Sequence, residues 1–165
     1  MEAFQIDDVR GFMGHMLQKD TFDDFLLCEA EIRGKASLEL DGHLPNDFYS
    51  PEESEERSSE GGFSSYGDLR PLCFEAVRGK HTPGYMKFVF GATNSLRREI
   101  LSGQDVDPED VTGFYINAMF RDGQLTTTTG TSMRTFTMDK TAETLWDQWF
   151  RNFLERVKIS YTNMA

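Results

Sequence analysis

A short basic segment is the first part of the chain whose side chains could do chemistry. It runs from Arg78 to Pro83 and brings Lys80 and His81 together within a chain of net charge −11. Cations of this kind can bind a carboxylate or a phosphate. The same cations would offset the dipole at the end of a helix, and this structural role is the alternative. Lys80 and His81 are therefore candidate ligand-binding residues.

A second polar segment follows a run of threonines in the last third of the chain. Thr128, Thr131, Ser132 and Arg134 lie within it, around Gly130. Their hydroxyls, the backbone amides and the guanidinium could surround a carboxylate or a phosphate. The alternative is a threonine-rich strand that faces solvent and is broken or bulged at the glycine. These four side chains are the remaining candidate ligand-binding residues.

The motifs that define the common enzyme and metal-binding classes do not occur. The sequence lacks a GxGxxG fingerprint, a P-loop, a GxSxG elbow, HExxH and CxxC, and its three histidines lie in different predicted elements. The acidic residues 105–110 depart from a calcium loop, because Asp110 and Ile116 stand where that loop needs Gly and Glu. We therefore expect no metal and no cofactor, and no catalytic residue can be assigned.

Composition limits the classes of partner and the compartment. A net charge of −11 and a pI near 4.7 oppose binding to nucleic acid and to an anionic membrane, since both are polyanions. There is no N-terminal signal peptide and no apolar run near ~18 residues, so we expect a soluble, cytoplasmic protein. Cys28 and Cys73 lie far apart in apolar runs and are expected to be buried thiols.

The clearest elements that would position these side chains lie between residues 112 and 158. Apolar and mainly polar residues alternate from Phe114 to Arg121, which is typical of a strand with one buried face. Asp122-Gly123 predicts a two-residue type I′ turn, which would pair Arg121 with Gln124 in a hairpin. After Gly130, residues 133–138 resume an extended pattern.

A long helix should follow this hairpin. Apolar side chains recur at three- and four-residue spacing from Leu145 to Val157, and both tryptophans, Trp146 and Trp149, lie on that stripe. Asp139 or Thr141 can cap its start. We expect the stripe to pack on the apolar face of the hairpin.

The rest of the chain supplies two further helices, a second hairpin, a strand and a loop. A helix capped by Asp7 or Asp8 is predicted over residues 9–17, and the strands 25–33 and 35–41 should form the hairpin. Residues 68–78 favour a helix over a strand, residues 86–92 a strand and residues 94–101 a short helix. The fold class is therefore α+β, in two layers: an antiparallel sheet built from hairpins, packed against helices that include a long C-terminal one. We expect a single domain over residues 1–165, with a mobile acidic loop at 51–62.

Short signatures along nearly the whole chain carry a resemblance. They are residues 22–27 (FDDFLL), 70–74 (RPLCF), 79–83 (GKHTP), 87–90 (KFVF), 129–136 (TGTSMRTF) and 146–149 (WDQW). With them the chain resembles an uncharacterised bacterial family, a domain of unknown function found mainly in anaerobic Gram-positive bacteria. The resemblance implies a small cytoplasmic protein and supplies no catalytic residue.

Three hypotheses for function remain after these exclusions. We expect a non-enzymatic binding or protein-interaction domain, whose partner is an unknown protein or a small anionic ligand. The alternative is a small enzyme without a known motif, in which Lys80 or Arg134 orients an anionic metabolite and His81 acts as acid or base. The third is self-association, as a homodimer, through surplus aromatic side chains on the last helix.

Overall fold

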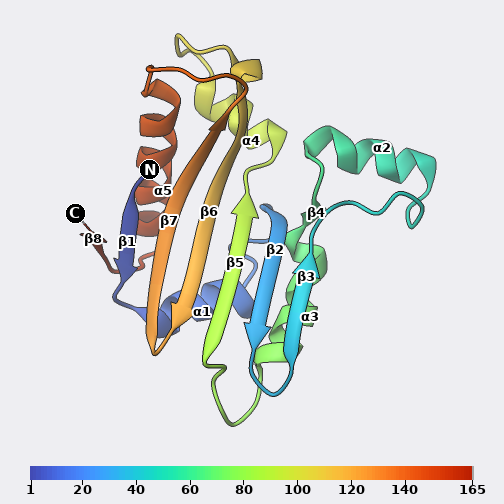
Figure 1. Cartoon of the computed structure of the whole chain (residues 1–165), viewed down its shortest axis with the longest axis vertical. Coiled ribbons are helices and arrows are strands. Elements are labelled where there is room, and N and C mark those ends of the chain that lie inside the picture. The colour runs from blue at the N-terminus through green and yellow to red at the C-terminus, as the bar shows by residue number, and fades with distance from the viewer. Residues whose placement is uncertain (165) are drawn as a thin grey trace.

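The computed structural model describes residues 1–164, and its centre is an eight-stranded antiparallel sheet (Figure 1). The strand order is β3-β2-β5-β6-β7-β1-β8, and the short β4 pairs with β2. The strands are β1 (Ala3–Ile6), β2 (Leu26–Arg33), β3 (Ser37–Asp41), β4 (Ser64–Ser65), β5 (Tyr85–Gly91), β6 (Val111–Arg121), β7 (Gln124–Met133) and β8 (Tyr161–Met164).

Helices cover one face of this sheet. They are α1 (Val9–Leu17), α2 (Pro51–Glu60), α3 (Tyr66–Val77), α4 (Asn94–Leu101) and α5 (Thr141–Arg156), with a 3-10 turn at Pro108–Asp110. Figure 1 shows α1, α3 and α5 behind the strands, while α2 projects to one side. Phe88 and Ile116 on the covered face are fully buried, whereas Lys87 and Asn117 on the other face are not. The α+β fold class is confirmed. Within residues 1–164, no helix has both the length and the apolar character needed to cross a bilayer.

The hairpin of β6 and β7 forms in the predicted register. Arg121 pairs with Gln124. Asp122 and Gly123 have φ values of 53° and 77°, and a type I′ turn requires positive φ at both positions. The hairpin prediction is therefore confirmed.

The aromatic stripe of α5 packs on this hairpin, as predicted. The Trp146 indole is fully buried, and its ring lies parallel to that of Phe114 with centroids 5.0 Å apart. Its Nε1 donates to the Tyr115 carbonyl at 2.9 Å. The N-cap residue is Lys140, which makes no side-chain cap bond, so neither Asp139 nor Thr141 is the N-cap; the Asp139 carboxylate still accepts from the Thr141 N–H at 2.9 Å.

The irregularity expected at Gly130 lies instead on the partner strand. β7 continues through Gly130 to Met133, and the register shifts between Val111 and Gly113 of β6. A Cβ at Gly113 would come within 2.4 Å of the Tyr115 hydroxyl oxygen, so the close approach of that ring favours glycine there. The predicted break or bulge at Gly130 is therefore wrong.

The extended segment predicted over residues 133–138 is absent beyond the end of β7. Met133 pairs with Val111, which is the first residue of β6, so residues after Met133 have no strand to pair with. The chain leaves the sheet there, and Phe136 is 90% exposed. The prediction of a strand over 134–138 is wrong for this reason.

The acidic segment expected to be a loop contains a helix. α2 begins after Ser50, whose hydroxyl accepts from the Glu53 N–H at 3.2 Å, and Pro51 occupies its first position. Arg57 donates to Asp68 at 2.8 Å. Because α2 has no buried residue, its caps and ion pairs favour the helix without any core contact. The loop interpretation is corrected, and the mobility of the segment stays a prediction.

Three further differences from the predictions concern two edge strands, Cys28 and the start of α3. β1 and β8, which pair with each other at one edge of the sheet, were not expected. A register shift between Leu27 and Glu29 leaves Cys28 only partly buried, so the expectation of a buried thiol is corrected for this residue. α3 begins at Tyr66, ahead of the expected start at residue 68.

Candidate functional site

The two predicted anion-binding segments lie at opposite ends of the sheet. Lys80 and His81 are in the loop before β5, whose first residue, Tyr85, pairs with Arg121 beside the β6–β7 turn. The second segment runs along β7 from Thr128 to Met133, which pairs with Val111 at the opposite end of the hairpin, and continues to Arg134. From Val111 to Arg121 the strand takes ten steps, or ~33 Å at ~3.3 Å per residue. The structure therefore does not bring the two segments together.

Arg134 and Ser132 of the second segment already have partners within the protein, whereas the buried Oγ1 of Thr131 has no hydrogen-bond partner among residues 1–164. The Arg134 guanidinium donates to Asp110 at 2.6 Å, and the Ser132 hydroxyl accepts from Thr112 at 2.6 Å. A shallow hollow of about 350 Å³ lies beside Arg134. The remaining two candidates are within β7, Thr128 and Thr131.

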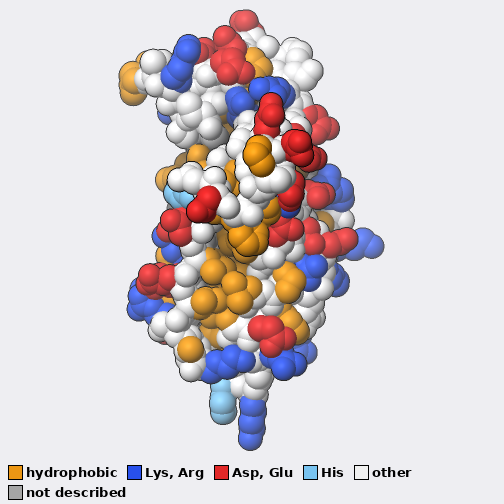
Figure 2. Space-filling view, turned by 90° about the vertical axis from the view of Figure 1, so that its right-hand side faces the viewer, with side chains coloured by type: hydrophobic (Ala, Val, Ile, Leu, Met, Phe, Trp, Pro, Cys, Tyr) orange, Lys and Arg blue, Asp and Glu red, His pale blue; other side chains and the backbone are white. Residues whose placement is uncertain are grey.

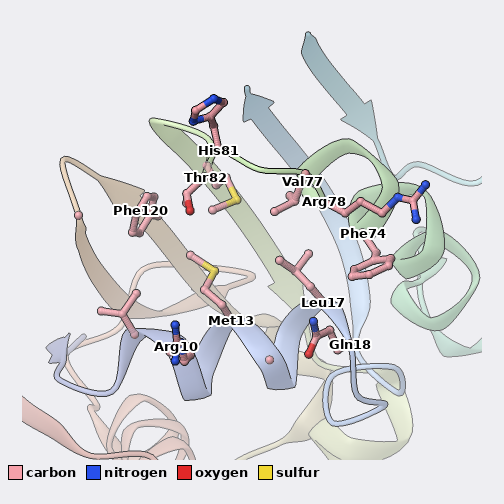
Figure 3. Close-up of a pocket in the computed structure, with 15 residues that line it drawn as sticks. Arg10, Met13, Leu17, Gln18, Phe74, Val77, Arg78, His81, Thr82 and Phe120 are labelled. Atoms are coloured by element: carbon pink, nitrogen blue, oxygen red, sulfur yellow. The ribbon is translucent and has the colours of Figure 1, made fainter. Parts of the chain in front are cut away.

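The first segment borders a larger hollow, which we call the apolar groove. It lies between α1, α3 and the turn end of the sheet and has a volume of about 740 Å³ (Figure 3). Its apolar lining consists of Val9, Met13, Leu17, Phe74, Val77, Met86 and Phe120. Its polar lining consists of Arg10, Gln18, Arg78, His81 and Thr82.

Helix α1 provides one wall of the groove. Val9, Met13 and Leu17 follow one another at four-residue spacing and so lie on one side of the helix. The start of α1 is held by Asp8, whose carboxylate accepts from the Gly11 N–H at 2.9 Å. Figure 3 shows Met13 and Leu17 pointing from α1 toward the space below the 78–82 loop.

Helix α3 provides the facing wall and is tied to the α1 region. The Arg70 guanidinium binds both carboxylate oxygens of Asp23, at 2.7 and 3.1 Å. The buried Tyr66 hydroxyl donates to the Met16 carbonyl at 2.8 Å. These bonds fix the distance between the two helices, so the groove is built into the fold.

A basic loop, residues 78–84, forms the rim between α3 and β5. Gly79 has φ 149°, which favours glycine. The loop meets the β2–β3 turn, from which Lys35 Nζ donates to the Arg78 carbonyl at 3.1 Å. A second hollow, of about 430 Å³, lies on this side of the loop. We call it the basic hollow; its basic side chains are Arg33, Lys35, Arg78, Lys80 and His81.

Three observations describe the groups near the groove that could take part in chemistry. His81 lies at the edge of the groove on the exposed loop, and among residues 1–164 its ring makes no hydrogen bond to a side chain that could orient it. The described part of the chain contains no cluster of three or more His, Cys, Asp or Glu side chains that could hold a metal ion. Burial raises the pKa of the Cys73 thiol to about 11, so this side chain of α3 stays neutral and unreactive.

Sequence reasoning found the basic loop and missed the groove. It predicted the helix over residues 9–17 without noting that Val9 and Met13 would be only partly buried. It also gave no role to Phe74 of α3. The available signal was the surplus of apolar residues on these two helices, of which only α3 adjoins the basic segment in the sequence.

Comparisons with known proteins place the chain in a family. No curated protein and no solved structure matched it. A model of a protein family matches residues 15–162, a range that includes α3, the basic loop and the whole hairpin. The chain therefore belongs to the family of unknown function DUF5721.

Proposed function

We propose that this protein is a non-enzymatic binding domain whose ligand occupies the apolar groove. The observation that carries the proposal is a hollow of about 740 Å³ with an apolar lining and a cationic rim. Ligand pockets of ~300–1,000 Å³ are typically apolar with a few polar groups that orient the ligand. Here Arg10 and Arg78 are the cations among the lining residues. The ligand is therefore a small molecule with an apolar body and an anionic group.

The energetics of the groove support an apolar ligand body. Met13, Phe74 and Val77 are only partly buried, so a ligand that covers them removes apolar surface from water. Each Å² of apolar surface so buried contributes ~25 cal/mol. Since methionine side chains adapt to irregular shapes, Met13 and Met86 suit a flexible aliphatic chain.

A titration with decanoate tests this proposal. Met13→Asp places a charge in the groove and should weaken binding at least about tenfold, because the aliphatic chain of decanoate would then cover a carboxylate and remove it from water. Met119→Asp is the matched control, since Met119 is 38% exposed on the open face of the sheet. Isothermal titration calorimetry measures both affinities, and circular dichroism checks that both variants fold. Equal affinities for the two variants, or no binding to the unmodified protein, would refute the proposal.

The cellular compartment and origin of the protein are inferred from the sequence resemblance and from its two cysteines. We infer a cytoplasmic protein of bacterial origin, in anaerobic Gram-positive species, as the sequence resemblance implies. The thiols of Cys28 and Cys73 are both free, which supports a reducing compartment. A protein partner and a homodimer stay predictions. α5 offers little surplus aromatic surface for a dimer, since Phe150 and Phe153 are buried in the core.

A further inference from the structure

We infer that the ligand of the apolar groove is a single-chain phosphate monoester, with its chain in the groove and its phosphate in the basic hollow. This inference rests on the proposed function and adds the chemical class of the head group. It depends on three observations: the charge of the basic hollow, its unused hydrogen-bond donors, and its place directly beside the groove.

The basic hollow is positively charged, although the protein as a whole is acidic. The chain has a net charge of −11, yet the residues that line this hollow include no Asp or Glu. They do include three cations: Arg33 at the end of β2, Lys35 of the β2–β3 turn and Lys80 of the basic loop. Figure 2 shows Lys, Arg and His side chains gathered at this lower end of the molecule. A positive hollow on an acidic protein attracts anionic ligands selectively.

Several donors in this hollow are unused. Two of its guanidiniums are engaged, since Arg33 donates to Glu31 at 2.8 Å and Arg78 lies 3.1 Å from Glu75. By contrast, neither Lys35 nor Lys80 has a carboxylate within 4.0 Å among residues 1–164.

The backbone of the basic loop adds further donors. Within the described part of the chain, the N–H groups of residues 79–82 donate to no protein acceptor. A phosphate monoester carries close to two negative charges at neutral pH and three strong acceptor oxygens. The Lys80 ammonium, the remaining N–H bonds of the Lys35 ammonium and this run of amides therefore match a phosphate better than a carboxylate.

The groove and the basic hollow adjoin each other at the end of α3 and the basic loop. Both are lined by Val77, Arg78, Gly79, His81 and Thr82, so the two hollows lie on either side of this segment. No atom lies within 4 Å of the position that a Cβ on Gly79 would take, which leaves room for a head group to pass over the loop. A chain in the groove can thus place its phosphate beside Lys35 and Lys80.

The same observations favour a soluble ligand over a membrane surface. An anionic bilayer would repel a protein of net charge −11. A free monoester carries little charge by comparison and can reach the basic hollow without that repulsion.

Calorimetric titrations of the full chain with decyl phosphate, decanoate and decan-1-ol, all kept monomeric, test the inference. Decyl phosphate should bind at least about tenfold more tightly than decanoate, which is the low end for one added charge-assisted hydrogen bond. The double variant Lys35→Ala/Lys80→Ala should lose this preference and keep its affinity for decan-1-ol. The double variant Arg98→Ala/Lys140→Ala carries the same change in charge away from both hollows and should keep the preference.

The outcomes separate this inference from the proposed function. Equal affinities of the unmodified protein for decyl phosphate and decanoate would overturn the phosphate inference, while decan-1-ol binding that Met13→Asp abolishes would leave the groove proposal standing. If inorganic phosphate binds as tightly as decyl phosphate and Met13→Asp has no effect, the groove proposal fails. Binding to phosphatidylglycerol vesicles without binding to monomeric decyl phosphate would also overturn the inference.

Discussion

The contact between α5 and the hairpin should be measurable through Trp146. Its indole is fully buried, stacks on Phe114 and donates to the Tyr115 carbonyl at 2.9 Å. Trp146→Phe keeps an aromatic ring but removes that donor and leaves a cavity where the second ring was. A lost hydrogen bond costs ~1 kcal/mol and a large-to-small core change of this size costs ~1–2 kcal/mol more, so the free energy of unfolding should fall by ~2–3 kcal/mol.

Urea unfolding followed by circular dichroism measures this loss. With a slope of ~2 kcal/mol/M, the midpoint of Trp146→Phe should lie ~1 M below that of the unmodified protein. Trp149→Phe is the matched control, because Trp149 is only partly buried and its indole N–H makes no hydrogen bond within residues 1–164. Its midpoint should fall by less than half as much. A midpoint for Trp146→Phe within ~0.2 M of the unmodified protein, or a larger shift for Trp149→Phe, would refute the packing argument.

Two further predictions concern a thiol and a turn. Burial raises the pKa of Cys28 to about 12, so at pH 8 its alkylation by iodoacetamide should be far slower than that of a thiol of ordinary pKa and should rise with pH, since only the thiolate reacts. Peptide mapping by mass spectrometry measures this rate, and labelling as fast as that of a free thiol would contradict it. Gly123→Ala puts a Cβ on a residue with φ 77° and should cost ~1–2 kcal/mol. Gly84→Ala, at a residue without positive φ and with open space around it, should be near neutral, and urea unfolding measures both variants.

Local signals made part of the fold predictable. The Asp122-Gly123 turn determines the register of β6 and β7 from the chemistry of two adjacent residues. The start of α1 is equally local, since Asp8 directly precedes the helix and its carboxylate accepts from the Gly11 N–H three residues later. The stripe of α5 was readable because its period is that of a helix and its apolar face is wide. In each case the residues that decide the structure are neighbours in the sequence.

Elements that depend on distant partners were not predictable. β1 and β8 each contain four residues, and they pair Ala3 with Met164 across nearly the whole chain. Neither segment has enough residues for a period of two to stand out. The basic hollow shows the same limit, because Lys35 and Lys80 come from different loops that meet only in the folded chain.

The position of the groove follows from where the aromatic core ends. Phe22 lies at the centre of the helical layer, with ring centroids 5.4 Å from Phe12, 4.9 Å from Phe90 and 5.3 Å from Phe153. These rings join the α1–β2 loop, α1, β5 and α5 in a close-packed cluster that needs no ligand.

Toward the β6–β7 turn, the side chains of the helical layer that face the sheet are less buried. There the facing side chains include Met13 and Val77, which are only partly buried and contribute less to the core. Because stability depends mainly on the aromatic cluster and ligand binding on the groove, a substitution at Met13 should alter binding more than folding. The same separation would let the groove change its ligand during evolution while the aromatic cluster preserves the fold.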